Sequence, residues 1–134
     1  MVTRIARSKQ PLNGTRPQTL RRDIEERTFR FAVRIVKMAR ALPQDIASQV
    51  VIRQVTRCGT SVGANVEEAQ GSHSRAEFIR RMGIARSESR ETFYWLRLIA
   101  EVGLVQRSKL ESIITESEEL LRILTAIVKN SRKV

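Results

Sequence analysis

Apolar residues recur every three or four positions through most of the chain, in four successive stretches. The first stretch covers residues 19–42, and its apolar positions are Ile24, Phe31, Ile35, Met38 and Leu42. Charged residues take up much of the remainder, so the spacing predicts an amphipathic helix. Pro43 ends it, because the residue before a proline avoids the helical region of backbone space.

The same periodicity predicts helices over about residues 44–70, 74–102 and 107–130. Gly71 and Gly103 follow two of these stretches and are typical helix stops. Ser74 and Ser108 each have a glutamate three residues later, which is the spacing of a capping box. We therefore expect the third and fourth helices to begin at these serines.

Short connections between four helices predict that neighbouring helices run antiparallel. No run of alternating apolar and polar residues bounded by turn residues competes with this interpretation. We expect an all-α protein, an antiparallel up-down four-helix bundle over residues 19–131. Residues 1–18 contain four basic residues and no acid. They are interpreted as a basic flexible arm, either a solvated tail or a segment that binds polyanions.

Small residues, an Asn and two adjacent acids lie near the middle of the chain, in TSVGANVEEAQGS over residues 60–72. Gly59 and Gly63 lie four residues apart, and glycine inside a helix costs about 1 kcal/mol relative to alanine. A close helix–helix contact would compensate for that cost. Ser61, Asn65 and Glu68 share another face, which is either a hydrogen-bond network that fixes helix register or a ligand or subunit contact.

The chain is strongly basic, with a formal net charge of +11 and a pI near 11.3. Such a charge favours polyanionic partners: RNA, DNA or an anionic membrane surface. A single cysteine, Cys58, excludes an internal disulfide and a thiolate zinc site, and is expected to be a small buried hydrophobe. The single cysteine suits a reducing cytoplasm, where we expect the protein to be located. No apolar run is long enough to span a bilayer, so we expect no membrane insertion.

The sequence contains no arrangement of residues that is typical of a catalytic site. His73, the one histidine, falls in the predicted turn between the second and third helices. Glu67 and Glu68 are adjacent and would point about 100° apart on a helix, which does not suit paired-acid chemistry. No phosphate-binding glycine loop or Glu-x-x-His repeat occurs. We therefore predict no catalytic residue, no metal ligand set and no cofactor.

Several short motifs resemble one known family. They are QVTR at 54–57, SVGANVEE at 61–68, EF at 77–78, IA at 84–85 and ETFYWL at 91–96. In these motifs the sequence resembles the four-helix-bundle proteins encoded by intervening sequences in bacterial 23S rRNA genes, over about residues 25–130. Many members have Gly at the position of Ala69 and Ser at that of Glu88, departures that leave the expected fold unchanged.

The resemblance implies a left-handed antiparallel bundle that assembles into a ring, most often a homopentamer, around a central channel. A similar protein, the accessory variability determinant of diversity-generating retroelements, forms such a basic barrel and binds nucleic acid and a reverse transcriptase. Ser61, Asn65, Glu68 and Glu91 match recurring polar positions of the family. On that basis we predict that Asn65, Glu68 and Glu91 join the second and third helices through buried hydrogen bonds.

Charge and resemblance together predict a non-enzymatic oligomer that binds RNA or DNA through the phosphate backbone with low sequence specificity. The residues expected to make these contacts are Arg21, Arg22, Arg30, Arg34, Lys37, Arg40, Arg53 and Arg57. Further arginines follow on the third helix: Arg75, Arg80, Arg81, Arg86, Arg90 and Arg97. The alternative is a protein-interaction scaffold that recruits an acidic partner, such as a reverse transcriptase complex.

Overall fold

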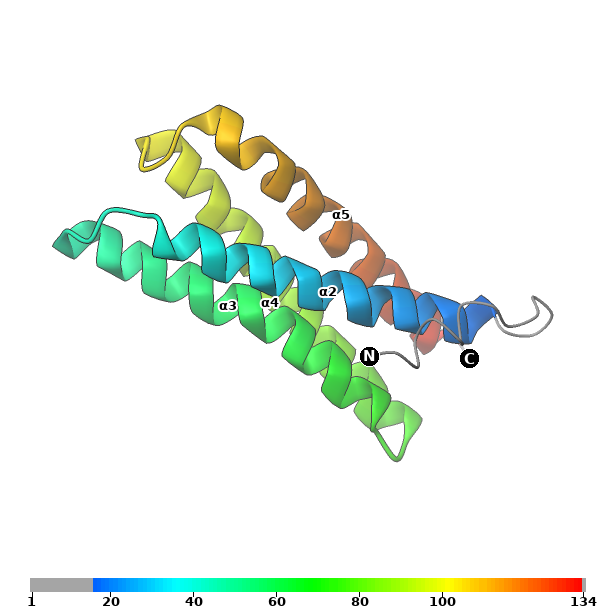
Figure 1. The fold of residues 1–134 in the computed structure, drawn as a ribbon. Coiled ribbons are helices and arrows are strands. Elements are labelled where there is room, and N and C mark those ends of the chain that lie inside the picture. The colour runs from blue at the N-terminus through cyan, green and yellow to red at the C-terminus, as the bar shows by residue number, and fades with distance from the viewer. Residues whose placement is uncertain (1–15, 134) are drawn as a thin grey trace, which may run out of the picture.

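A computed structural model describes the backbone of residues 16–133 and the side chains of residues 23–133. Within this range the chain forms four helices and no strand, as the periodicity predicts (Figure 1). They are α2 (Arg16–Arg40), α3 (Ile46–Gln70), α4 (Arg75–Val102) and α5 (Arg107–Arg132). Residues 1–15 of the expected arm lie outside the described residues, whereas residues 16–18 belong to α2.

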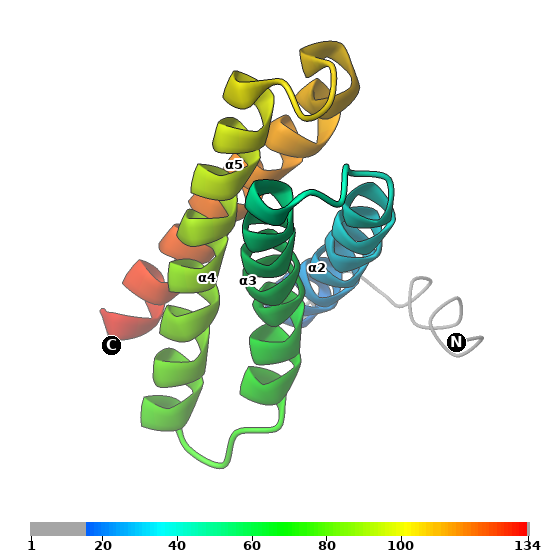
Figure 2. The ribbon, with the colours of Figure 1, turned by 90° about the vertical axis from the view of Figure 1, so that its left-hand side faces the viewer.

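The helices run up and down as a bundle. The α2–α3 and α4–α5 connections lie at one end, and the α3–α4 turn lies at the other, near the end of α5 (Figures 1 and 2). Consecutive helices pack along much of their length, and the contact between α2 and α5 is the least extensive. Arg27 on α2 bridges this seam by donating to Glu116 and Glu119 on α5, at 2.8 and 2.7 Å. The hydrogen bond to Glu116 is the main reason that the pKa of Arg27 is raised.

The core is mainly aliphatic and is built by all four helices. Its largest fully buried side chains include Phe31 and Ile35 on α2, Met82 and Leu96 on α4, and Leu120 on α5. These positions are the apolar faces that the three- and four-residue spacing predicts. Cys58 is also fully buried, which confirms its expected role as a small hydrophobe, and burial raises the pKa of its thiol.

Two glycines set the distance between α2 and α3. A Cβ at Gly59 would lie 2.9 Å from the Ile35 side chain, and a Cβ at Gly63 would lie 3.1 Å from the Thr28 carbonyl oxygen. The close contact predicted from their spacing is therefore confirmed, and its partner is α2. The hydroxyl of Thr28, which is fully buried, donates back to the Ile24 carbonyl at 2.8 Å and so needs no partner on α3.

Side-chain hydrogen bonds cap the N-termini of two of the helices. Ser74 caps α4 by accepting from the Glu77 amide at 3.1 Å, as predicted. Asp45, which the sequence interpretation overlooked, caps α3 through the Ser48 amide at 3.0 Å. The second predicted capping box is wrong: α5 begins at Arg107, its N-cap is Gln106, and no side chain caps it. Ser108 is thus inside the helix.

Candidate nucleic-acid interface

Three exposed basic side chains lie on the last turn of α2 and the second turn of α3. Lys37 and Arg40 on α2 and Arg53 on α3 are exposed, and none forms an ion pair with an acid in the described part of the chain. Gly59 lies against Ile35 in the antiparallel pair, so Arg40 and Arg53 lie at about the same level of neighbouring helices. We name these three side chains, Lys37, Arg40 and Arg53, the basic patch.

The other arginines predicted to bind phosphate either have partners within the chain or lie outside the described side chains. Arg34 is exposed and donates to the Ser112 hydroxyl at 2.8 Å, so it meets no acid there. Arg30 pairs with Glu26 one turn earlier at 2.8 Å. Arg57 pairs with Glu88 and Glu91 on α4. The side chains of Arg21 and Arg22, which also belong to the predicted set, lie outside the described residues.

Helix α4 adds basic side chains elsewhere on the surface. Arg80, Arg90 and Arg97 are exposed and pair with no acid among residues 23–133. The guanidinium carbon of Arg97 lies 5.5 Å from the centre of the Phe93 ring, which is within the range of a cation–π contact. Positive charge is therefore distributed over α2, α3 and α4. Arg57 is partly neutralised across the α3–α4 seam, and Arg30 is partly neutralised within α2.

The predicted polar network is divided between two separate sets of contacts. Asn65 donates to the carbonyl and hydroxyl of Ser61, at 2.9 and 3.0 Å, and its amide oxygen accepts from Arg81 on α4 at 3.4 Å. Its link to α4 is therefore Arg81, which the prediction did not include. Glu68 is exposed and makes no hydrogen bond with the described side chains, so it lies outside both sets.

The second set of contacts centres on Glu91, whose carboxylate joins α4 to α3. One carboxylate oxygen accepts from the Trp95 indole at 3.0 Å and also from Arg57 on α3. The Trp95 hydrogen bond is the main reason that the pKa of Glu91 lies below its ordinary value of 4.5. Burial acts in the opposite direction, and the hydrogen bond and charge of Arg57 add to the lowering. Trp95 packs partly against the core and forms a T-shaped pair with the Tyr94 ring, with ring centres 5.0 Å apart.

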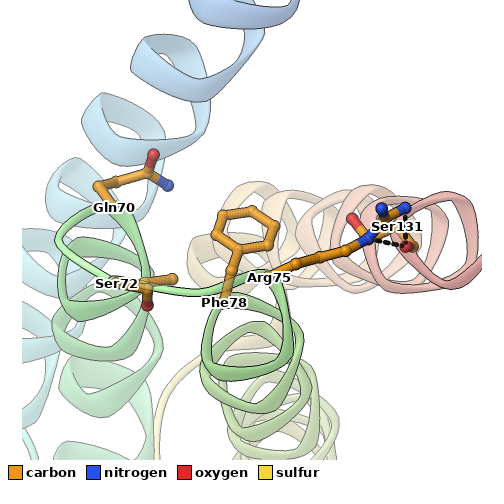
Figure 3. A pocket seen from close by; sticks show the side chains of 6 residues that line it. Gln70, Ser72, Arg75, Phe78 and Ser131 are labelled. Atoms are coloured by element: carbon orange, nitrogen blue, oxygen red, sulfur yellow. Dashed lines mark hydrogen bonds between the residues drawn. The ribbon is translucent and has the colours of Figure 1, made fainter. Parts of the chain in front are cut away.

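A pocket of about 430 Å³ opens at the end of the bundle where α3 turns into α4. It is lined by Ala69, Gln70, Ser72, Arg75, Phe78 and Ser131. In Figure 3 the Gln70 amide points toward the Phe78 ring from α3, and Arg75 extends from α4 to the Ser131 carbonyl of α5, at 2.8 Å. None of these residues except Arg75 was considered for binding from the sequence.

Apolar side chains are exposed near the other end of the α3–α4 pair. Ile46 and Val50 at the start of α3 are 84% and 52% exposed, and Tyr94 and Val102 toward the end of α4 are 53% and 58% exposed. Antiparallel packing brings the start of α3 beside the end of α4. We name these four side chains, each of which the fold leaves more than half exposed, the apolar face.

Metal ligands and membrane spans were both sought in the described residues. Residues 23–133 bring no three side chains of His, Cys, Asp or Glu together in a way that could hold a metal ion. None of the helices described has a stretch long and apolar enough to pass through a bilayer.

Comparison with known proteins identifies the family. The sequence profile described as 23S rRNA-intervening sequence protein matches residues 21–126. The chain belongs to this family. The assignment confirms the resemblance carried by the motifs between residues 54 and 96. The comparison with curated proteins found no match.

A solved structure agrees with the family assignment. It is a protein of unknown function from the S23 ribosomal protein family of Bacteroides thetaiotaomicron, 38% identical in sequence. The similarity covers 81% of this chain and 97% of that one, with a TM-score of 0.75. This member of the 23S rRNA-intervening sequence protein family therefore shares its bundle with a relative of unassigned role.

Proposed function

We propose that this protein binds RNA or DNA through phosphate contacts, with little readout of base sequence and without catalysing a reaction. The basic patch is the observation that carries the proposal. Its side chains are exposed and have no acidic partner among the described residues, so their charge is available to an external anion. The net charge of +11 adds a long-range attraction to any polyanion.

Arginine suits this role better than lysine in one respect. A guanidinium presents paired N–H donors that fit two phosphate oxygens at once. Arg40 and Arg53 lie at about the same level of adjacent helices, and Lys37 lies one turn from Arg40. Such a group can contact successive phosphates of one strand, which supports backbone-directed binding to a single strand or a duplex.

A pair of matched double variants tests the basic patch. Arg40→Gln with Arg53→Gln removes two unpaired charges, and Arg107→Gln with Arg122→Gln removes two charges that pair with Glu101 and Glu118. Both variants lower the net charge equally. We expect the first to weaken binding of a fluorescent single-stranded RNA and of a duplex DNA about tenfold, and the control to have a much smaller effect.

Two results would argue against the proposal. Equal losses of nucleic-acid affinity in both double variants would mean that only overall charge matters and that the basic patch makes no phosphate contacts. Absence of binding by the unaltered protein at low salt would remove the nucleic-acid function altogether. The alternative, a scaffold for an acidic protein partner, predicts instead that a captured partner remains bound after nuclease treatment.

The apolar face supports self-association as part of this function. Four large apolar side chains that are each more than half exposed lie near one end of the α3–α4 pair, and grouped apolar surface of this kind marks an interaction site. We propose that these four side chains are covered by further copies of the chain in a ring. Repetition of the basic patch around the ring would strengthen the positive electrostatic field that attracts a polyanion. Native mass spectrometry of the unaltered chain and of Val50→Lys should show loss of the oligomer in the variant.

A further inference from the structure

A second pocket lies along the seam between α2 and α5. Its volume is about 520 Å³, which is within the range of pockets that bind ligands. The contact between these two helices is the least extensive between neighbouring helices of the bundle, and this leaves room for the pocket. We name it the seam pocket. The residues that line it are Asp23, Ile24, Glu26 and Arg27 of α2 and Ile123, Ala126, Ile127 and Asn130 of α5.

The seam pocket offers apolar surface from both helices. Ile24 belongs to the core, and Ile123 and Ile127 are partly buried and pack against it. Ala126 is exposed beside them. Removing apolar surface of this kind from water is favourable, at about 25 cal/mol per Å². An occupant with an apolar side chain would therefore be stabilised in this pocket.

Acidic side chains surround the seam pocket, although the protein as a whole is strongly basic. Asp23 and Glu26 line it, and Glu116 and Glu119 lie beside it because both pair with Arg27. Asp23 is exposed and forms no ion pair with the described side chains. The chain carries a net charge of +11, so a positively charged occupant is favoured here over its basic surfaces.

We propose that residues 1–15 of this same chain occupy the seam pocket. The segment reads MVTRIARSKQPLNGT and combines three basic residues with no acid. Its Ile5 has Arg4 on one side and Arg7 on the other. Entry of Ile5 into the pocket would bury an apolar side chain and bring both arginines to the surrounding carboxylates. This is a third role for the segment, besides a solvated tail and a binding site for polyanions.

The length of the connection allows this contact. α2 begins at Arg16, and Asp23 lies seven residues later, about 10 Å along the helix. The chain from Ile5 to Arg16 can extend over roughly 35 Å, so Ile5 can reach the pocket. A tethered segment has an effective concentration on the order of 1 mM. A Kd of about 0.1 mM for the free segment would therefore keep the pocket about nine-tenths occupied.

Trypsin cleavage of the full chain tests the proposal, because the segment has cleavage sites after Arg7 and Lys9. The reference is a synthetic peptide of residues 1–15, which has no pocket to occupy. Without nucleic acid, we expect cleavage after Arg7 to be about tenfold slower in the chain than in the peptide, because only the undocked segment is cleaved. Mass spectrometry of early time points measures both rates.

Ala126→Lys and Ala64→Lys are a matched pair of variants. Both alanines are exposed and helical, and both changes add one positive charge, but only Ala126 lines the pocket. Ala126→Lys should restore the cleavage rate of the peptide, because the lysine fills the pocket and repels the arginines of the segment. Ala64→Lys should keep the protection. Ile5→Ser, compared with a peptide carrying the same change, should lose it and decides the matter if Ala126→Lys does not fold.

Three results would overturn the proposal. The first is an equal cleavage rate in the chain and the peptide. The second is undiminished protection in Ala126→Lys, which would place the segment elsewhere on the protein. The third is protection that falls as the protein is diluted, which would assign the pocket to the segment of a second copy. The inference does not rest on phosphate binding, since the basic patch lies at the other end of α2 and its affinity is measured separately.

Discussion

Single residues decide how closely α2 and α3 approach. At Gly63 an added Cβ would meet the backbone carbonyl of Thr28 at 3.1 Å, and a backbone atom cannot rotate away. At Gly83 the same Cβ would meet nothing within 4 Å. Gly63→Ala should therefore destabilise the chain by about 1–3 kcal/mol, whereas Gly83→Ala should stabilise it by up to about 1 kcal/mol.

Urea unfolding of both variants measures this difference. The two changes add the same methyl group to a helix interior, so a common effect on helix propensity cancels in the comparison. Equal free energies of unfolding for the two variants would show that Gly63 does not set the helix spacing. The spacing of glycines in the sequence predicted this contact, but only the structure shows that α2 is the partner.

The carboxylate of Glu91 links stability to pH. Its pKa is lowered in the folded protein by Trp95 and Arg57. Its contribution to the free energy of unfolding is thus complete above its ordinary value of 4.5 and is lost as the pH falls through the folded pKa. Glu91→Gln should remove part of the loss of stability below about pH 4.5.

Thermal unfolding from pH 7 to pH 3 checks this prediction. Glu67→Gln is the control, since the Glu67 side chain is exposed and forms no hydrogen bond or ion pair with the described residues. Parallel stability curves for the unaltered chain and Glu91→Gln would contradict the role given to this carboxylate.

At the scale of helices, periodicity predicted each element but not each end. Ser74 and Ser108 have the same capping-box spacing, yet only Ser74 caps a helix. After Gly103, which adopts a left-handed backbone conformation, Leu104 and Val105 pack against the core. α5 then starts at Arg107, the first residue of the predicted range, so Ser108 lies inside the helix. Sequence spacing alone contains no information about such tertiary contacts.

The two serines therefore give a direct test at this scale. Ser74→Ala should lower the free energy of unfolding by about 1 kcal/mol, because the amide of Glu77 loses its acceptor. Ser108→Ala should be close to neutral, because the exposed Ser108 accepts no capping hydrogen bond. Comparable losses in both variants, measured by urea unfolding, would show that Ser108 caps α5 in solution.

For the whole molecule, the sequence predicted more of the fold than of the binding surfaces. The all-α bundle follows from local periodicity and from motifs that identify the family. The end-of-bundle pocket joins Arg75 to Ser131, which are 56 residues apart in the chain. Contacts at such separations depend on how the helices pack. The basic residues could be found in the sequence, but which of them meet acids, as Arg30 and Arg57 do, required the structure.

The central claim is that exposed basic residues bind phosphate. The most direct measurement is the affinity of the unaltered chain for a fluorescent single-stranded RNA across a salt series. Three contacts from the basic patch would give a slope of log affinity against log salt of about −2, and further contacts would make it steeper. A slope near zero, or no binding at the lowest salt concentration, would contradict the account.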